Sequence, residues 1–478
     1  AETGNYATAL DIDEAYELIH SERTTVDDQE KDFLASQQSG QKNDTYGPPP
    51  SIRSDADNLN KAGWGIIWPP KPFTYAEQSH YEALKALIDY RRQQMGGKEP
   101  HQFYYKTGWS YDDFLWEEAR QVEPGNMKPN IVPYYLCIVA SPERISWEFQ
   151  QYLSGEYAVG RIWFDDPTDC ERYVQHLITY EKSQNKSLNN QEVLFWATHH
   201  PNDQPTRNSS TKLVRPLHDW LKDEAVLNIS TSLFSGKQAN FRGGKDELLK
   251  CLKGQKTDDS PRALPTLLFT ASHGLEHNKP SVTQDKTQGA LICQDWPGGF
   301  TTPNPTHYFS AEDVDNKMKL TGMIFFCFAC YSAGTPLMQD WVRPSHFKKP
   351  AKIALRPFVA RLPQKLLAQG LIAFIGHVSK AWDSSFLGIQ GNSDQQDVIR
   401  ETLRELLNNQ PVGHAVDYLN ERWGKLTTLL DKRVADKKRK YTKEQIVATW
   451  MARNDCRGFV VLGDPAAKLM LKSRTKNQ

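Results

Sequence analysis

The stretch GMIFFCFACYSAGTP, residues 322–336, decides how the rest of the chain is interpreted. Six of its first seven residues are apolar, which is typical of a strand buried on both faces of a sheet. Cys330 follows this run, and the residues after it are small and polar. Free cysteines are usually buried core residues. The alternative is that the strand holds the Cys330 thiol at its open end.

Similar apolar runs recur along the chain, with helical patterns between them. The runs are YYLCIVA (134–140), YAVGRIWF (157–164), EVLFWA (192–197), LPTLLFTA (264–271), LIAFIGHV (371–378) and GFVVLG (458–463). Apolar spacing predicts helices that end near Met95, that span 166–183, and that occupy about 394–410 and 412–440. Buried strands alternating with helices predict an α/β fold with a parallel sheet.

The length of 478 residues suggests two to four domains. Residues 1–60 are polar and include a linker rich in Gln, Ser, Gly and Pro, so they predict a partly disordered arm. The polar break QNKSLNNQ (184–191) is the main predicted boundary. It separates an α/β subdomain at 61–185 from a second one at 190–478.

The composition excludes several classes of function. Lys plus Arg and Asp plus Glu are both 58, so zero net charge gives no support for nucleic-acid binding. No apolar run approaches the length of a membrane helix, and no Gly-rich phosphate loop is present. We therefore expect no nucleic acid, membrane or cofactor as partner. The seven cysteines are an odd, scattered set, which favours free thiols and a cytoplasmic location.

Two strand ends carry residues that suit nucleophilic chemistry. His273 and Gly274 follow one apolar run, and Cys330 follows the next long one. Because the carboxyl ends of parallel strands share one edge, an imidazole and a thiol would meet there. The histidine would activate the thiol, and the N–H groups of Gly274 and Cys330 would form an oxyanion hole. The caspase family also places its histidine about 50 residues before its cysteine.

Other interpretations of these residues remain open. Cys330 could be a core cysteine and His273 a hydrogen-bonded loop histidine. Cys327 and Cys330 formally make a CxxC motif, but side chains three apart on a strand face opposite ways, so Cys327 is assigned to the core. The same alternation argues against a metal site at His199 and His200, and we predict no metal.

The segments SHG (272–274) and ACYSAG (329–334), each after an apolar strand, resemble caspase-like cysteine peptidases of clan CD. The resemblance is closest to the gingipain-like and CHAT-domain branch, because GLIAFIGHVSKAW (370–382) and VVLGDPAAKL (460–469) resemble its later segments. Residues 134–145 and 157–181 resemble its non-catalytic subdomain, so the match covers roughly 130–470. The resemblance implies a caspase-like sandwich of two related subdomains, the second catalytic. It implies a cysteine endopeptidase with Cys330 as nucleophile and His273 as acid and base. Ser332 stands where family members often have Gly, a small departure.

The sequence says less about substrate recognition than about the catalytic residues. By the resemblance, Trp382 stands where a pocket wall would be, while a core tryptophan is the other interpretation. Asp203 and Asp295 are acids in loops that could bind a basic side chain, or simply solvated turn residues. We expect a protein substrate and an activating or inhibitory protein partner, with residues 1–60 as the arm that mediates latency. The alternative function is a catalytically silent scaffold or sensor that binds partners.

Overall fold

The computed structural model describes most of the chain between residues 55 and 472. The described residues are 12–13, 15–17, 19, 55–119, 122, 127–183, 191–224, 229–236, 243–255, 264–277, 279–299, 301–318, 320–339, 352–388, 395–436 and 440–472. The predicted linker and most of the predicted arm lie outside these residues, as does the predicted boundary at 184–190.

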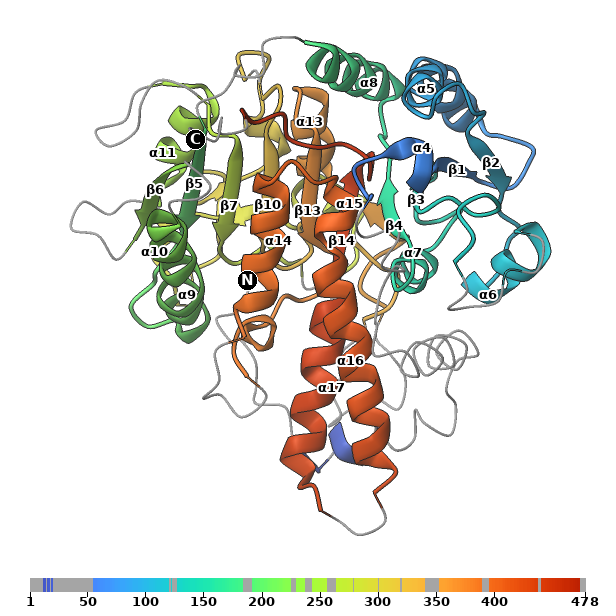
Figure 1. The fold of residues 1–478 in the computed structure, drawn as a ribbon. Coiled ribbons are helices and arrows are strands. Elements are labelled where there is room, and N and C mark those ends of the chain that lie inside the picture. The colour runs from blue at the N-terminus through green and yellow to red at the C-terminus, as the bar shows by residue number, and fades with distance from the viewer. Residues whose placement is uncertain are drawn as a thin grey trace, which may run out of the picture.

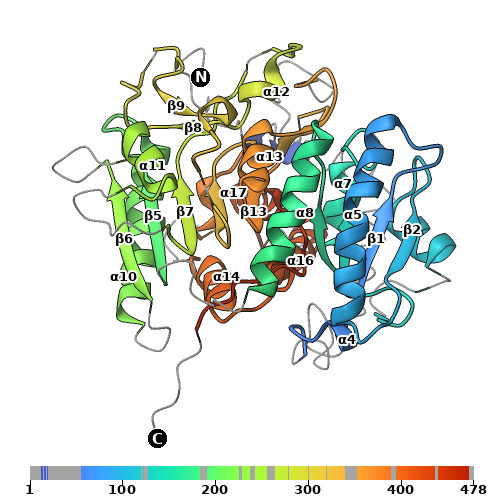
Figure 2. The ribbon, with the colours of Figure 1, turned by 90° about the horizontal axis from the view of Figure 1, so that it is seen from above.

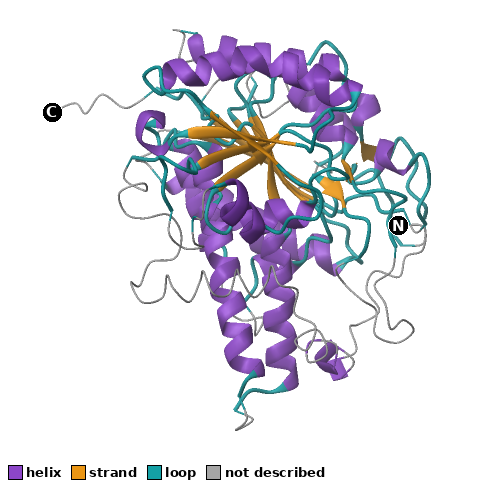
Figure 3. Ribbon diagram, turned by 90° about the vertical axis from the view of Figure 1, so that its right-hand side faces the viewer, coloured by secondary structure: helices purple, strands orange, loops and turns teal. Residues whose placement is uncertain are grey.

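A ten-stranded sheet runs through the middle of the molecule, with helices packed on both sides (Figure 1, Figure 3). Its order is β2-β1-β3-β4-β14-β13-β10-β7-β5-β6. The strands are β1 (Trp64–Trp68), β2 (His101–Tyr104), β3 (Tyr135–Ile138), β4 (Ala158–Arg161), β5 (Glu192–Ala197), β6 (Ser230–Ser235), β7 (Leu267–Ala271), β10 (Ile324–Phe328), β13 (Ala373–His377) and β14 (Phe459–Gly463). Two short pairs lie outside it, β8 (Leu291–Ile292) with β9 (Tyr308–Phe309) and β11 (Gly334–Thr335) with β12 (Phe358–Val359).

Pairing within the large sheet is parallel except where β13 meets β14. The prediction of an α/β fold with a largely parallel sheet is therefore confirmed. Every residue of β10 is buried, as the continuous apolar run predicted. The last strand differs from expectation only in direction, since β14 is antiparallel to β13.

The order of strands divides the sheet into two sides (Figure 2). Strands β1 to β4 come from the first part of the chain and form one side, coloured blue to cyan-green. Strands β5, β6, β7, β10 and β13 form the other. The closing strand β14 returns from the carboxyl end of the chain and lies between β4 and β13.

Long helices cover the two faces of the sheet. The helices are α4 (Leu59–Ala62), α5 (Tyr75–Gln94), α6 (Tyr111–Asp113), α7 (Trp147–Leu153), α8 (Pro167–Lys182), α9 (Gln204–Asn208), α10 (Arg215–Asp223), α11 (Lys245–Leu252), α12 (Gln284–Thr287), α13 (Arg361–Ala368), α14 (Asp397–Leu407), α15 (Val412–Ala415), α16 (Asp417–Val434) and α17 (Lys443–Arg457). Single turns of other helix types are η1 (Phe114–Glu118), η2 (Ser209–Val214), η4 (Ala311–Asp313) and η5 (Asp383–Ser385). None of the described helices is both long and apolar enough to span a bilayer.

Helix predictions were confirmed where apolar spacing was regular. Helix α5 ends at Gln94 with Met95 as its cap, and α8 buries Tyr173, Leu177 and Tyr180 as predicted. The single helix predicted at 412–440 was wrong, because two helices, α15 and α16, occupy this stretch and α16 ends at Val434. The sequence reading also missed α17, whose exposed face is polar.

Helices α16 and α17 form a hairpin that projects from the body (Figure 1). Described residues between 12 and 19 are helical and lie against this hairpin, where Ala15 and Ile19 share a buried cluster with Leu430, Ile446 and Trp450. An ion pair joins Lys443 to Asp13 at 2.6 Å. The described residues among 12–19 are thus anchored on α16 and α17.

Candidate active site

Cys330 lies two residues beyond the end of β10, at the carboxyl edge of the sheet. All seven cysteines are free, and Cys330 alone among them is partly exposed. Cys327, inside the strand, has no exposed surface, as expected for a core residue. The strand therefore ends by bringing one thiol to the surface.

The backbone reverses immediately after this thiol. Tyr331 has φ of 56°, a left-handed conformation that is uncommon for a bulky residue. The buried Tyr331 is held there by its N–H, which donates to the Ser379 carbonyl at 2.8 Å. Strained residues of this kind persist where the surrounding structure fixes them, often beside reactive groups. The turn keeps Cys330 at the outer point of the loop.

His273 and Gly274 follow β7, which pairs with β10 in the register Ala271 to Phe328. The two loops therefore leave the sheet side by side, as predicted from the sequence. A Cβ atom on Gly274 would lie 1.9 Å from the Cys330 carbonyl oxygen, so only glycine permits this approach. The two segments that carry the resemblance are thus in backbone contact.

The N–H of Gly274 points out of the short ladder beside it. Gly274 faces Leu291 in an antiparallel bridge, whose hydrogen bonds run from Leu275 N to Ala290 O (2.7 Å) and from Ile292 N to His273 O (2.9 Å). Gly274 and Leu291 therefore form a non-hydrogen-bonded pair of the antiparallel ladder, and the Gly274 amide is directed away from Leu291. Among the described residues, neither this amide nor that of Cys330 donates to a backbone carbonyl.

Asp203 forms the main polar contact of the His273 ring. Its Oδ2 lies 2.8 Å from His273 Nε2, and both side chains are largely buried. The same oxygen accepts hydrogen bonds from Thr206 Oγ1 (2.6 Å) and Thr206 N (3.2 Å), because Asp203 is the N-cap of α9. Burial opposes ionisation, but the bonds from His273 and Thr206 outweigh it and lower the pKa of Asp203 to about 2.

Trp296 and His200 complete the surroundings of His273. The ring of the buried Trp296 stands edge-on to that of His273, with centroids 6.3 Å apart, and to that of His200 at 5.2 Å. Burial and the neighbouring His273 lower the pKa of His200 to about 4. His200 is therefore neutral near pH 7, and it adds no second cation beside His273.

A buried polar network supports the opposite wall, the loop after β13. Asp455 of α17 accepts hydrogen bonds from Trp382 N (3.0 Å), Ser384 Oγ (2.8 Å) and Ser385 Oγ (2.7 Å). It also lies 3.4 Å from Nε2 of the buried His377. Burial lowers the pKa of His377, but bonds and charge from Asp455 outweigh this and raise it. This network fixes the loop that faces Cys330.

The Cys330 thiol donates to a carbonyl of that loop, Ala381 O, at 3.7 Å. Burial and the negative charge of Glu276 raise the pKa of Cys330 to about 11, against the opposing effects of Lys380 and the Ala381 bond. Glu276 and Lys380 are themselves paired at 3.1 Å. An ion pair thus joins the His273 loop to the Cys330-facing loop, beside the thiol.

This arrangement predicts opposite effects for the two charges on thiol reactivity. We expect Glu276→Gln to lower the pKa of Cys330 and speed its alkylation by iodoacetamide at pH 8 by about threefold to tenfold. Lys380→Met should slow it by a similar factor. Rates are read by mass spectrometry of the Cys330 peptide, with the buried Cys327 as internal control. Equal rates in both variants would show that the pair does not act on the thiol.

The remaining predicted residues lie around this centre. Asp295 is exposed, and its carboxylate accepts a bond from Lys245 N (2.6 Å) at the start of α11. Trp382 is partly buried against the α16–α17 cluster. Asp203 contacts His273, which sequence reasoning did not foresee. The substrate-binding roles of all three stay predictions.

The described residues contain no group of His, Cys, Asp and Glu arranged to hold a metal ion.

Residues 125–470 match the sequence model of peptidase family C25. No curated protein matches the chain.

Several solved structures are similar to this chain at low sequence identity. The Arg-specific cysteine proteinase gingipain R (RgpB) is 13% identical, with a TM-score of 0.48 over 86% of this chain and 78% of that one. A complex of Porphyromonas gingivalis RgpB pro- and mature domains gives 13% identity and 0.47, over 85% and 80%. A Saccharomyces cerevisiae separase–securin complex gives 12% and 0.33, over 70% of this chain and 15% of that one.

Proposed function

The chain belongs to peptidase family C25, and from this membership we propose that it is an endopeptidase using Cys330 as nucleophile and His273 as acid and base. The family identifies a cysteine peptidase and confirms the gingipain-like resemblance. The observation that carries the assignment of residues is the backbone contact between Gly274 and Cys330. It brings the histidine and cysteine loops to one point of the sheet edge.

The reaction follows from these groups. His273 takes the proton of the Cys330 thiol, and Sγ attacks the carbonyl carbon of the scissile bond. The imidazolium then protonates the leaving amine, and the C–N bond breaks to give an acyl-enzyme. Water, deprotonated by His273, attacks the thioester and releases the acid. The thiol regains its proton, so the chain is unchanged after one turnover.

Three further groups act on this sequence of steps. The Gly274 amide, directed out of its ladder, and the Cys330 amide donate to the oxyanion of each tetrahedral intermediate. Asp203 positions His273 by its bond to Nε2, so that Nδ1 is the nitrogen that exchanges the proton. Its ionised carboxylate also stabilises the imidazolium.

The protonated state of the resting Cys330 thiol supports the proposed latency. A thiol of pKa about 11 is almost entirely protonated at neutral pH, and its bond to Ala381 O directs the proton toward the loop after β13. Activation then requires this loop to move or a substrate to displace it. The loop is tied to α17 through Asp455, and residues 15 and 19 pack on the same hairpin. We therefore propose that the predicted arm transmits partner binding to the thiol.

The same thiol favours the alternative function, a silent scaffold or sensor. A protein that only binds partners needs no ionised cysteine. It equally needs neither a glycine fitted against the Cys330 backbone nor an acid bonded to the histidine. For this reason we place the peptidase first. A regulatory partner, a CHAT-domain relationship and a cytoplasmic location stay predictions.

The deciding experiment compares wild type with Cys330→Ala on a peptide library and an unfolded protein, with new amino termini read by mass spectrometry. We expect new termini inside the chains with wild type and none with Cys330→Ala. A latent enzyme is separated from a silent one by pH-dependent alkylation of Cys330 in wild type and His273→Ala. Loss of wild-type reactivity in His273→Ala supports the dyad. Equal rates together with no new termini would favour the scaffold.

A further inference from the structure

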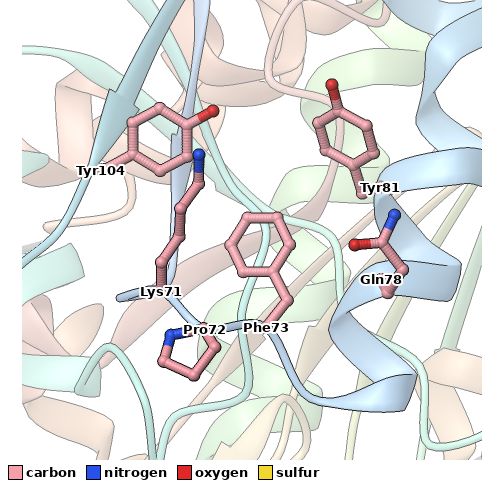
Figure 4. A pocket seen from close by; sticks show the side chains of 6 residues that line it. All are labelled: Lys71, Pro72, Phe73, Gln78, Tyr81 and Tyr104. Carbon is pink, nitrogen blue, oxygen red and sulfur yellow. The ribbon is translucent and has the colours of Figure 1, made fainter.

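A pocket of about 620 Å³ lies on the first side of the sheet, where β1 and β2 end (Figure 4). Its lining comes from the segment after β1, the first turns of α5 and the last residue of β2. The residues are Lys71, Pro72, Phe73, Gln78, Tyr81 and Tyr104. In parallel α/β sheets, ligands bind beyond the carboxyl ends of the strands. The pocket has this position, although the side of the sheet it belongs to carries no catalytic residue.

Aromatic rings form the body of the pocket. Phe73 stacks near Tyr104 with centroids 6.4 Å apart and an interplanar angle of 27°, and it lies 6.1 Å from Tyr81. The fully buried Trp68 backs them, 5.1 Å from Tyr81 and 6.1 Å from Phe73. Such surfaces suit a flat or ring-shaped apolar group, such as proline or an aromatic side chain.

One cation stands among these rings. Figure 4 shows the Lys71 side chain running beside Tyr104, and its Nζ lies 4.1 Å from the centroid of that ring. Lys71 is exposed, and within the described residues no carboxylate pairs with it. The tyrosine hydroxyls of Tyr81 and Tyr104 likewise have no hydrogen-bond partner in the described part of the chain. The rim thus offers an ammonium and two hydroxyls to an anionic group.

The pocket is connected to the nucleophile by one loop. Arg144, after β3, donates to Pro70 O at 2.6 Å beside the pocket, and to Glu77 at 2.8 Å. Trp147, which begins α7, donates to Thr335 O at 3.4 Å, and its ring fills the space next to Gly334. Gly334 is in the segment that continues from Cys330. A chain of contacts therefore leads from the pocket to the segment that follows the thiol.

The order of strands gives a lower bound for their separation. Five steps between neighbouring strands lead from β1 through β3, β4, β14 and β13 to β10. At about 4.8 Å a step, the pocket and the thiol are at least about 24 Å apart across the sheet. An extended peptide advances about 3.3 Å a residue, so a substrate segment that reaches both places is longer than about seven residues.

The acids predicted for the substrate pocket have other contacts. Asp203 is bonded to His273, and Asp295 to the start of α11. Their substrate-binding roles stay predictions, and the pocket offers a further surface for selection of the substrate. We propose that this pocket is an exosite for an extended segment of the protein substrate that carries an acidic residue next to a proline or aromatic one. This proposal rests on the proposed peptidase function and names the substrate class of that activity.

Binding can be tested without turnover. The probe is a fluorescent ten-residue peptide containing Glu-Pro-Phe, titrated into the full chain carrying Cys330→Ala, with fluorescence polarisation as readout. The matched peptide contains Gln-Pro-Phe. We expect the Glu peptide to bind about tenfold more tightly, and Lys71→Met to remove that preference. Tyr104→Leu should weaken both peptides. Lys317→Met, at an exposed lysine remote from the pocket, should change neither.

The outcomes separate this proposal from the peptidase assignment. Equal affinity of Lys71→Met and the parent for the Glu peptide overturns the exosite, whatever the catalytic result. Binding that depends on Lys71 supports it even if no bond is cleaved, and then the failure belongs to the catalytic proposal. With active enzyme, a long cleavable peptide that carries the Glu-Pro-Phe segment should show lower KM than the same peptide with Gln-Pro-Phe. Equal KM values would also overturn the exosite.

Discussion

Asp203→Asn is expected to lower kcat about 100-fold or more and to leave KM within about twofold. The asparagine keeps the size of the side chain and can still contact His273, but it removes the negative charge that stabilises the imidazolium. The carboxylate is ionised at every pH of a normal assay, because its pKa is lowered to about 2. The charge therefore acts throughout the pH range of catalysis.

A conservative variant distinguishes this role from simple support of the loop. Asp203→Glu keeps a carboxylate that can bond His273 Nε2, so we expect it to recover part of the kcat lost in Asp203→Asn. Loss of loop structure alone would leave Asp203→Glu no faster than Asp203→Asn, because asparagine is the better helix cap of the two.

The chain provides a matched control on α10. His218 Nδ1 and Asp219 Oδ1 are also 2.8 Å apart, but Asp219 is exposed and far from the thiol in sequence. Asp219→Asn should change kcat by less than about twofold. If Asp203→Asn behaves like Asp219→Asn, the acid does not position the histidine.

The sequence predicted the meeting of the two loops better than the contacts that support them. His273 and Cys330 were selected because each follows a long apolar run, and strands of that kind pair at the centre of a sheet. Asp203 was recognised only as a loop acid. Its cap signal, Asp203 before Gln-Pro-Thr, was readable, but its contact with His273 spans 70 residues and depends on how α9 meets the β7 loop. Spacing carries no information about such a contact.

The same limit applies to the fold. Central strands such as β10 and β13 are fully buried and read as unbroken apolar runs. The edge strands β2 and β6 are partly exposed and contain fewer apolar residues, so neither is marked by a continuous apolar run in the sequence. The direction of β14 was also unreadable, since a strand buried on both faces has the same pattern whichever way it runs. Its place between β4 and β13 is set by contacts made at its end.

Asp464, directly after β14, is expected to give the largest stability effect in the chain. Its carboxylate is fully buried and accepts bonds from Arg91 Nε (2.8 Å), Trp64 Nε1 (3.0 Å) and Ala466 N (2.9 Å). Arg91 also pairs with Glu181 at 2.6 Å. Burial disfavours the Arg91 charge, but Asp464 and Glu181 outweigh it and raise its pKa. The network joins α5, α8 and β1 to the end of the closing strand.

We expect Asp464→Asn to reduce the free energy of unfolding by about 3–5 kcal/mol, because it leaves the buried Arg91 with one of its two carboxylates. Urea unfolding followed by tryptophan fluorescence measures the change. Arg92→Met is the matched control on the same helix, since the Arg92 side chain is 40% exposed and its pairs with Asp89 and Glu99 should contribute less than about 1 kcal/mol.

A second variant tests the cause of the loss. Replacing the three charged groups together, as Arg91→Met and Glu181→Gln with Asp464→Asn, leaves no unpaired buried charge and should recover part of the stability lost in Asp464→Asn. If the triple variant is less stable than Asp464→Asn by the summed cost of the other two changes, the charges act independently and the argument fails. Recovery would mean that the buried charge itself sets the cost. Because β14 also pairs with β13, whose end carries His377 beside the thiol-facing loop, the position of the closing strand then links stability to the geometry of the site.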